Sequence, residues 1–103
     1  DKGELAAFRQ GKRRPAATLD LHGKKAAEVA DALAAFVQDA RRRGIGVVLV
    51  IFGRGNRSLG GAVLRDVTYD LVVGGHVGGV LAIASARPTD GGLGAAYLLV
   101  GRA

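Results

Sequence analysis

The stretch VVLVIF, residues 47–52, decides the fold of this chain of 103 residues. It is a continuous apolar run rich in β-branched side chains. A strand with one face in water alternates apolar and polar residues, whereas a strand covered on both faces gives an unbroken apolar run. We therefore predict a central strand over residues 47–52, buried on both faces.

The residues before this run predict a helix and a first strand. Apolar side chains recur at helical spacing over residues 24–43, and Gly44 follows as a C-terminal stop. Farther upstream, residues 18–22 read TLDLH and alternate as a strand does. A strand, helix and strand in this order form a right-handed parallel crossover, so the carboxyl ends of both strands meet at one sheet edge. Ligands of open α/β sheets bind at that edge.

A second helix and two more strands are predicted after the central run. Ser58 is expected to cap the helix, which ends where the sequence reads VVGGHVGG. The strands are expected at residues 80–85 and 96–100. The core face of the helix is predicted at Val63, Leu64, Val67 and Leu71.

The resulting order is β-α-β-α-β-β, which predicts a two-layer α/β domain over residues 18–103. Residues 1–17 contain the basic stretch GKRRP and show no periodicity, so we expect a mobile N-terminal arm or edge segment. The chain begins at Asp1 and has no methionine, so we expect it to be part of a longer protein.

The composition points to a polyanionic partner. Fifteen Lys and Arg against nine Asp and Glu give a formal net charge of +6, which in a small domain favours nucleic acid. Cysteine is absent, which agrees with a reducing cytoplasm and leaves no thiolate for a metal or a nucleophile. No apolar run approaches the ~20 residues of a membrane span.

An acid and a histidine stand together at the end of the first predicted strand. Strand alternation places Leu19 and Leu21 on one face and Asp20 and His22 on the other. An imidazole changes charge near neutral pH, and a carboxylate beside it orients it for acid–base chemistry. The alternative is a structural hydrogen bond on the outer face of the sheet. The pair is too small a ligand set for a metal site.

Glycines and cations surround this pair in the predicted fold. Lys24 and Lys25 follow His22 at a helix start, where cations are locally unfavourable unless an anion binds nearby. The loop after residue 52 reads GRGNRSLGG, which matches neither a dinucleotide fingerprint nor a P-loop. Glycines still allow a phosphate to approach the backbone, and Arg54 and Arg57 are suited to bind it. The alternative is a glycine-rich turn with solvated arginines.

These motifs together resemble the Smr (small MutS-related) domain, in its stand-alone bacterial form. LDLHG is followed by an apolar strand ending in GRG, by SLGGAVLRD, and by ARPTDGGLGAAYLLVGR at the C-terminal end. The resemblance covers nearly the whole chain. It implies a four-stranded mixed sheet in the order 1-2-4-3, similar to the C-terminal domain of translation initiation factor three.

The resemblance also implies nucleic-acid binding and, in many members, endonuclease activity on DNA or RNA. The family's Asp-x-His pair maps onto Asp20 and His22, the predicted catalytic residues. Its [His or Thr]-Gly-x-Gly motif begins at Phe52, where a polar residue is usual; the ring either ends the strand or stacks on a base. The predicted nucleic-acid contacts are Gly53, Arg54, Gly55, Arg57, Lys24, Lys25, Arg65, Lys12, Arg13 and Arg14.

Two main functions remain open from the sequence. A nuclease cleaving RNA needs no metal, whereas nicking of DNA calls for water attack helped by a divalent cation, Mg or Mn. The alternative is a non-catalytic module that grips backbone phosphates. A structural domain whose charge serves solubility is a third and weaker interpretation. We expect a cytoplasmic monomer whose partners are nucleic acid and the ribosome or the repair machinery.

Overall fold

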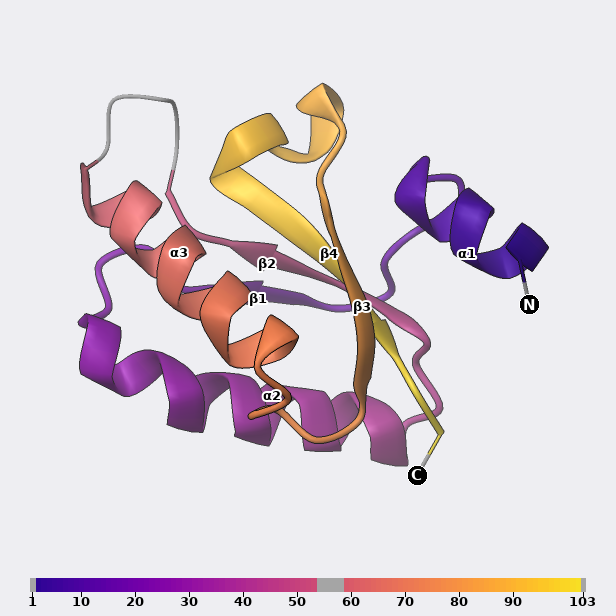
Figure 1. Ribbon diagram of the computed structural model, residues 1–103, viewed down its shortest axis with the longest axis horizontal. Coiled ribbons are helices and arrows are strands. Elements are labelled where there is room, and N and C mark those ends of the chain that lie inside the picture. The colour runs from indigo at the N-terminus through magenta and orange to yellow at the C-terminus, as the bar shows by residue number, and fades with distance from the viewer. Residues whose placement is uncertain (1, 54–58, 103) are drawn as a thin grey trace.

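The computed structural model describes residues 2–53 and 59–102, and a four-stranded sheet runs through its middle (Figure 1). The sheet order is β1-β2-β4-β3, which confirms the predicted order 1-2-4-3. β1 runs parallel to β2, and both β2 and β3 run antiparallel to β4. The strands are β1 (Thr18–Asp20), β2 (Val47–Ile51), β3 (Val80–Ser85) and β4 (Ala95–Val100).

β2 is the central strand that the apolar run predicts. Its first four residues are all buried. Val48 and Val50 pack into one apolar cluster, while Val47 and Leu49 pack into a second cluster. Successive side chains of a strand point to opposite faces, so the unbroken run reflects burial on both faces of the sheet.

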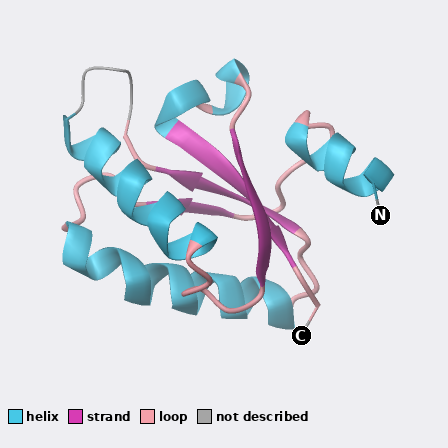
Figure 2. Cartoon of the chain, viewed as in Figure 1, coloured by secondary structure: helices cyan, strands magenta, loops and turns pink. Residues whose placement is uncertain are grey.

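Two helices cover one face of the sheet (Figure 2). They are α2 (Val29–Arg42), which follows a short 3-10 turn η1 (Ala26–Glu28), and α3 (Leu59–Val73). The core between helices and sheet is centred on Leu33, Val37, Val48, Leu64 and Leu98. This arrangement confirms the predicted two-layer α/β fold, and α3 ends just before Gly74 and Gly75, as predicted.

The predicted core face of α3 needs one correction. Leu64 is buried and Val67 and Leu71 pack against the core, but Val63 is 51% exposed. Residues 63 and 64 are neighbours on a helix and diverge by about 100°, so only one of them faces the sheet fully.

The N-terminal segment is not an irregular arm. Lys2–Arg9 form a helix, α1, which packs Phe8 onto the second face of the sheet. The Phe8 ring is fully buried and meets Tyr97 of β4 edge to face, with ring centres 6.4 Å apart. The helix has only 8 residues, and such a short helix gains its stability from packing rather than from sequence propensity. That explains why periodicity alone did not reveal it.

No helix in the described part of the chain is long and apolar enough to cross a membrane.

Candidate functional site

Asp20 and His22 meet at the carboxyl end of β1. The Asp20 carboxylate accepts two hydrogen bonds through Oδ1, from the backbone N–H of His22 at 3.0 Å and from its ring Nδ1 at 2.8 Å. Leu21 between them is fully buried, which fixes both polar side chains on the outer face. The predicted pairing of the acid and the histidine on one face is therefore confirmed.

The contact with Asp20 sets the tautomer of the neutral His22 imidazole. A carboxylate only accepts hydrogen bonds, so Nδ1 of His22 carries the proton and Nε2 of the neutral ring is left as an acceptor. The His22 side chain is 67% exposed, so a substrate can reach this nitrogen. An exposed pair of this kind contributes little stability. The geometry of the Asp20–His22 pair is therefore better suited to proton transfer than to stabilising the fold.

Gly23 turns the chain away directly after the histidine. Its φ is +80°, a backbone conformation that favours glycine, although a Cβ there would meet nothing within 4 Å. The turn closes with a hydrogen bond from the Lys24 N–H to the Leu21 carbonyl, 3.0 Å long. Glycine is required here by the backbone and not by a shortage of space.

Lys24 and Lys25 lie in this turn and precede the helix that was predicted to contain them. Lys25 has an extended backbone, and its N–H donates to the Glu28 carboxylate at 2.8 Å. Both lysine side chains are exposed. They therefore flank the Asp20–His22 pair on the chain without belonging to the first turn of α2.

The start of the glycine loop lies at the same sheet edge. Asp20 is in register with Ile51, and the Leu21 N–H still donates to the Ile51 carbonyl at 2.7 Å. The chain after Ile51 thus leaves the sheet beside His22, and buried Gly53 is the first residue of the predicted phosphate loop. Arg54, Gly55 and Arg57 lie outside the described residues.

Phe52 belongs to the core. Its side chain is 1% exposed and packs into the cluster beneath α2 and α3. The interpretation that this ring stacks on a base is therefore wrong, and the interpretation that Phe52 ends the apolar strand is confirmed. The N–H groups of Phe52 and Gly53 both donate to the Gly94 carbonyl, at 2.8 and 3.4 Å.

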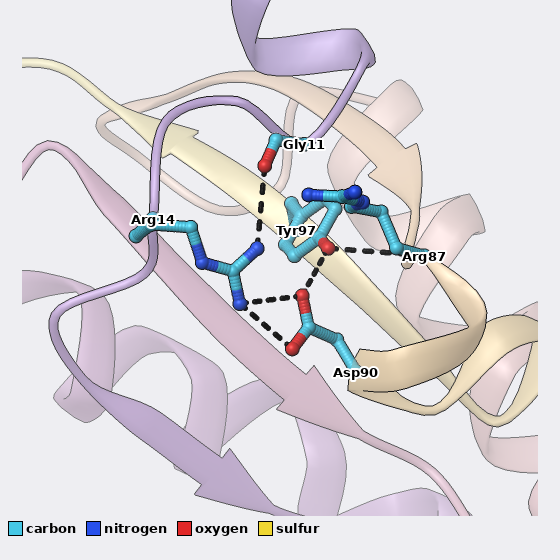
Figure 3. A network of polar contacts seen from close by, with 5 residues as sticks. All are labelled: Gly11, Arg14, Arg87, Asp90 and Tyr97. Carbon is cyan, nitrogen blue, oxygen red and sulfur yellow. Dashed lines mark hydrogen bonds and ion pairs between the residues drawn. The ribbon is translucent and has the colours of Figure 1, made fainter.

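Arg14 does not stand free for a phosphate. Its guanidinium forms an ion pair with both carboxylate oxygens of Asp90, at 2.7 and 2.8 Å, and donates to the Gly11 carbonyl (Figure 3). The buried Tyr97 hydroxyl donates to the same carboxylate and accepts from the Arg87 N–H. The hydrogen bond from Tyr97, and then that from Arg14, hold the pKa of Asp90 below its usual value.

This network has a consequence for the candidate site. Asp90 ends the short turn η2 (Pro88–Asp90), and η3 (Gly92–Gly94) follows and supplies the carbonyl that receives Phe52 and Gly53. The segment before β1 is thereby tied to the loop that supports Gly53. No sequence pattern pointed to Asp90 and Tyr97, because Arg14 and Asp90 are 76 positions apart.

The other predicted contacts lie elsewhere. The Arg13 guanidinium lies over Gly46, just before β2, at the end of the strand remote from His22. Arg65 on α3 pairs with Asp66 at 3.6 Å, and Lys12 is exposed after α1. The structure thus gathers Asp20, His22 and Gly53 at one edge, with the two lysines next in the chain. Arg13 lies away from this edge.

No three His, Cys, Asp or Glu side chains gather as metal ligands within residues 2–53 and 59–102. At the carboxyl end of β1, Asp20 already accepts two hydrogen bonds from His22. These described residues do not by themselves build a resident metal site.

A mixed α/β sheet in this order, with an acid and a histidine at its edge, defines a known class of domain. The model of the Smr domain family matches residues 19–101, and the chain belongs to that family. Smr domains bind nucleic acids and are often related to nucleases.

Two solved structures are similar to the chain. YdaL, a stand-alone small MutS-related protein from Escherichia coli, is 28% identical, with a TM-score of 0.80 over 99% of this chain and 77% of that one. The Smr domain of Thermus thermophilus MutS2 is 25% identical, with a TM-score of 0.67 over 81% of this chain and 95% of that domain. The predicted resemblance to small MutS-related proteins is confirmed.

A protein of Treponema pallidum (strain Nichols) described as uncharacterized is 35% identical over 100 residues. The match covers 91% of this chain and 48% of that protein, so the chain spans about half the length of this relative.

Proposed function

We propose that this domain cleaves RNA, with His22 as the group that moves the proton. The observation that carries the proposal is the 2.8 Å contact between Asp20 and Nδ1 of an exposed His22, which leaves Nε2 to face a substrate. A general base needs an accessible acceptor within hydrogen-bond reach of the proton that it takes. The Asp20–His22 pair provides that acceptor.

The reaction would begin at the 2′-hydroxyl of a ribose. Nε2 of His22 takes the hydroxyl proton, and the 2′-oxygen attacks the adjacent phosphorus. The bond from phosphorus to the 5′-oxygen breaks, and that oxygen takes a proton from solvent at the exposed edge. The products are a 2′,3′-cyclic phosphate and a 5′-hydroxyl, and the imidazolium then returns its proton to water. Asp20 keeps the ring oriented through its contact with Nδ1.

Cations next to the pair would hold the substrate. The exposed ammonium groups of Lys24 and Lys25 would bind the phosphates on either side of the attacked bond. Arg54 and Arg57 remain predicted contacts of the same kind, and Gly53 would allow a close approach to the backbone. The divalent cation predicted for nicking of DNA, and a ribosomal or repair partner, also remain predictions.

The test is cleavage of an end-labelled, partly single-stranded RNA in excess chelator. We expect His22→Ala to lower the rate by about 10²–10⁴-fold, the usual contribution of acid–base catalysis, while binding is retained. The control is His76→Ala, which removes the only other histidine of the chain, also exposed. A 2′-deoxy nucleotide at the cleaved position should block the reaction. Equal cleavage by wild type and His22→Ala would falsify the assignment.

A non-catalytic binding module is the second candidate. Phe52 favours it, because a buried apolar ring stands where members of the family usually carry a polar residue. Salt-sensitive RNA binding without cleavage by the wild type, in the same chelator and in added Mg²⁺ or Mn²⁺, would support this candidate over the nuclease.

A further inference from the structure

A second cationic site lies at the other end of β2. A groove of about 670 Å³ opens where β2 begins, where β4 ends and where α2 ends. Figure 1 shows the C-terminus close to the end of α2 in this region. The described charged side chains that line the groove are one acid, Glu4, and four arginines: Arg13, Arg41, Arg42 and Arg102.

Arg41 is the anchor of this groove. It is half-buried, and it donates to two neutral acceptors: the Arg102 carbonyl at 2.8 Å and the Gln38 side-chain oxygen at 3.5 Å. Its Nε is buried with no hydrogen-bond partner among the described residues, packed against Gly79, where a Cβ would lie 2.8 Å from it. A guanidinium drawn out of water without a carboxylate is unfavourable, and a bound anion would offset that.

Arg13 and Arg42 extend the positive charge across the groove. Arg13 lies against Gly46, where a Cβ would be 2.6 Å from its Nη2, so its guanidinium packs closely on the backbone that leads into β2. The Arg42 side chain is 71% exposed, and the carboxylate with which it pairs, that of Asp39, is 3.7 Å away. An ion pair that long and that exposed does not neutralise the guanidinium. Three guanidinium groups on one groove, each with planar N–H donors, suit the oxygens of phosphate.

We propose that this groove binds backbone phosphates of the same nucleic acid that the Asp20–His22 edge acts on, an inference that rests on the proposed function. The two sites lie at opposite ends of β2, whose 5 residues span about 16 Å at ~3.3 Å each. An A-form RNA duplex rises less per base pair than the ~3.4 Å of B-DNA, so at least about five base pairs separate the two sites. The groove holds the flanking strand while the reaction takes place at the other end.

The test is binding of an oligonucleotide with 2′-O-methyl riboses, which the proposed reaction does not cleave, measured by fluorescence anisotropy over a range of salt. In the double variant Arg13→Gln/Arg42→Gln we expect affinity at low salt to fall about tenfold and the salt slope to drop by about 1.4–1.8. The matched control is Arg9→Gln/Arg43→Gln. It removes the same charge from the end of α1 and from the residue after α2, and neither position lines the groove.

Oligonucleotide length sharpens the test. Oligonucleotides too short to span the two sites engage them one at a time, so loss of Arg13 and Arg42 should weaken their binding less than it weakens the binding of longer duplexes that span both sites. Equal binding of long duplexes by the two double variants, with melting temperatures unchanged, would overturn the proposal. The proposal would also be overturned if binding of inorganic pyrophosphate depended on Arg13 and Arg42 while binding of the oligonucleotide did not. The groove would then be a site for a free anion.

The two proposals fail separately. A wild type that binds the oligonucleotide through the groove and cleaves no RNA would overturn the nuclease alone. Cleavage that is unchanged at saturating RNA in Arg13→Gln/Arg42→Gln, with weaker binding, supports both.

Discussion

At the carboxyl end of β2 the functional side chains come from one short stretch of chain, Asp20 to Lys25, together with Gly53. At the amino end, the four arginines of the groove come from three separate segments: the linker after α1, the end of α2 and the residues after β4. The first site depends on two hydrogen bonds between residues two positions apart, at 3.0 and 2.8 Å. The second depends on packing that brings distant segments together. A single substitution should therefore abolish the first site, whereas the second should weaken in steps.

The largest effect expected on stability concerns the helix beside the amino end. Phe8 is fully buried against Tyr97, so Phe8→Ala should lower the free energy of unfolding by about 3 kcal/mol, the low end for such a truncation because α1 is short. That corresponds to a fall in Tm of more than about 10 °C. The control, Leu93→Ala, truncates a side chain that is 60% exposed and should change stability by less than about 0.5 kcal/mol.

Hydrogen exchange in Phe8→Ala shows whether the two ends are separable. The Lys12 N–H, bonded to the Ala7 carbonyl, should lose protection as α1 frays. The Leu21 N–H, hydrogen-bonded to the Ile51 carbonyl at the carboxyl end, should lose no more protection than the fall in the variant's global stability accounts for. Equal loss at both amides would mean that the two ends of the sheet open together and are not separable.

The second effect concerns the ion pair that joins the N-terminal segment to the loop supporting Gly53. Asp90→Asn should lower the free energy of unfolding by about 1 kcal/mol at pH 7, the scale of one hydrogen bond. The pKa of Asp90 is held below its ordinary value in the folded state, first by Tyr97 and then by Arg14. Its contribution is therefore full above the unfolded pKa, about 3.9, and is lost as pH falls through the folded value.

Urea unfolding of wild type and Asp90→Asn checks this sign. The difference between the free energies of unfolding of the two proteins should stay constant from neutral pH down to about pH 5 and should become smaller below about pH 4. Tyr97→Phe removes the first hydrogen bond to Asp90, which should bring the folded pKa of Asp90 closer to its unfolded value. The pH range over which this variant loses the contribution of Asp90 should therefore be narrower than in the wild type. A difference that grows on acidification would contradict the assignment of the network to an ionised Asp90.

These contrasts also explain what the sequence could predict. The central strand, the two long helices and the Asp20–His22 pair follow from patterns within a few residues, and all of them are present. The sheet order was implied by the family resemblance, carried by LDLHG and the glycine loop. By contrast, α1 is stabilised by Phe8 on Tyr97, and Arg14 finds Asp90 across 76 positions. Contacts at such separations leave no periodic signal, so Arg14 was predicted as a phosphate ligand although it is an ion-pair partner.

The smallest effect compares two glycines, one at each end of β2. Gly23 follows His22 at the carboxyl end, and Gly44 precedes β2 at the amino end; their φ values are +80° and +71°, and a Cβ at either would meet nothing within 4 Å. Alanine should therefore cost about 1 kcal/mol of stability at each position, through backbone conformation alone. Only Gly23→Ala disturbs the turn that orients His22, so only that variant should cleave RNA more slowly, by up to about 100-fold if the ring is displaced by ~1 Å. Gly44→Ala, as the matched control, should match its loss in Tm and keep the wild-type rate at saturating RNA, because Gly44 lines the groove and not the reacting edge. Equal rates in the two variants would show that the turn at Gly23 contributes stability and no catalytic geometry, and the carboxyl end would then depend on the Asp20–His22 contact alone.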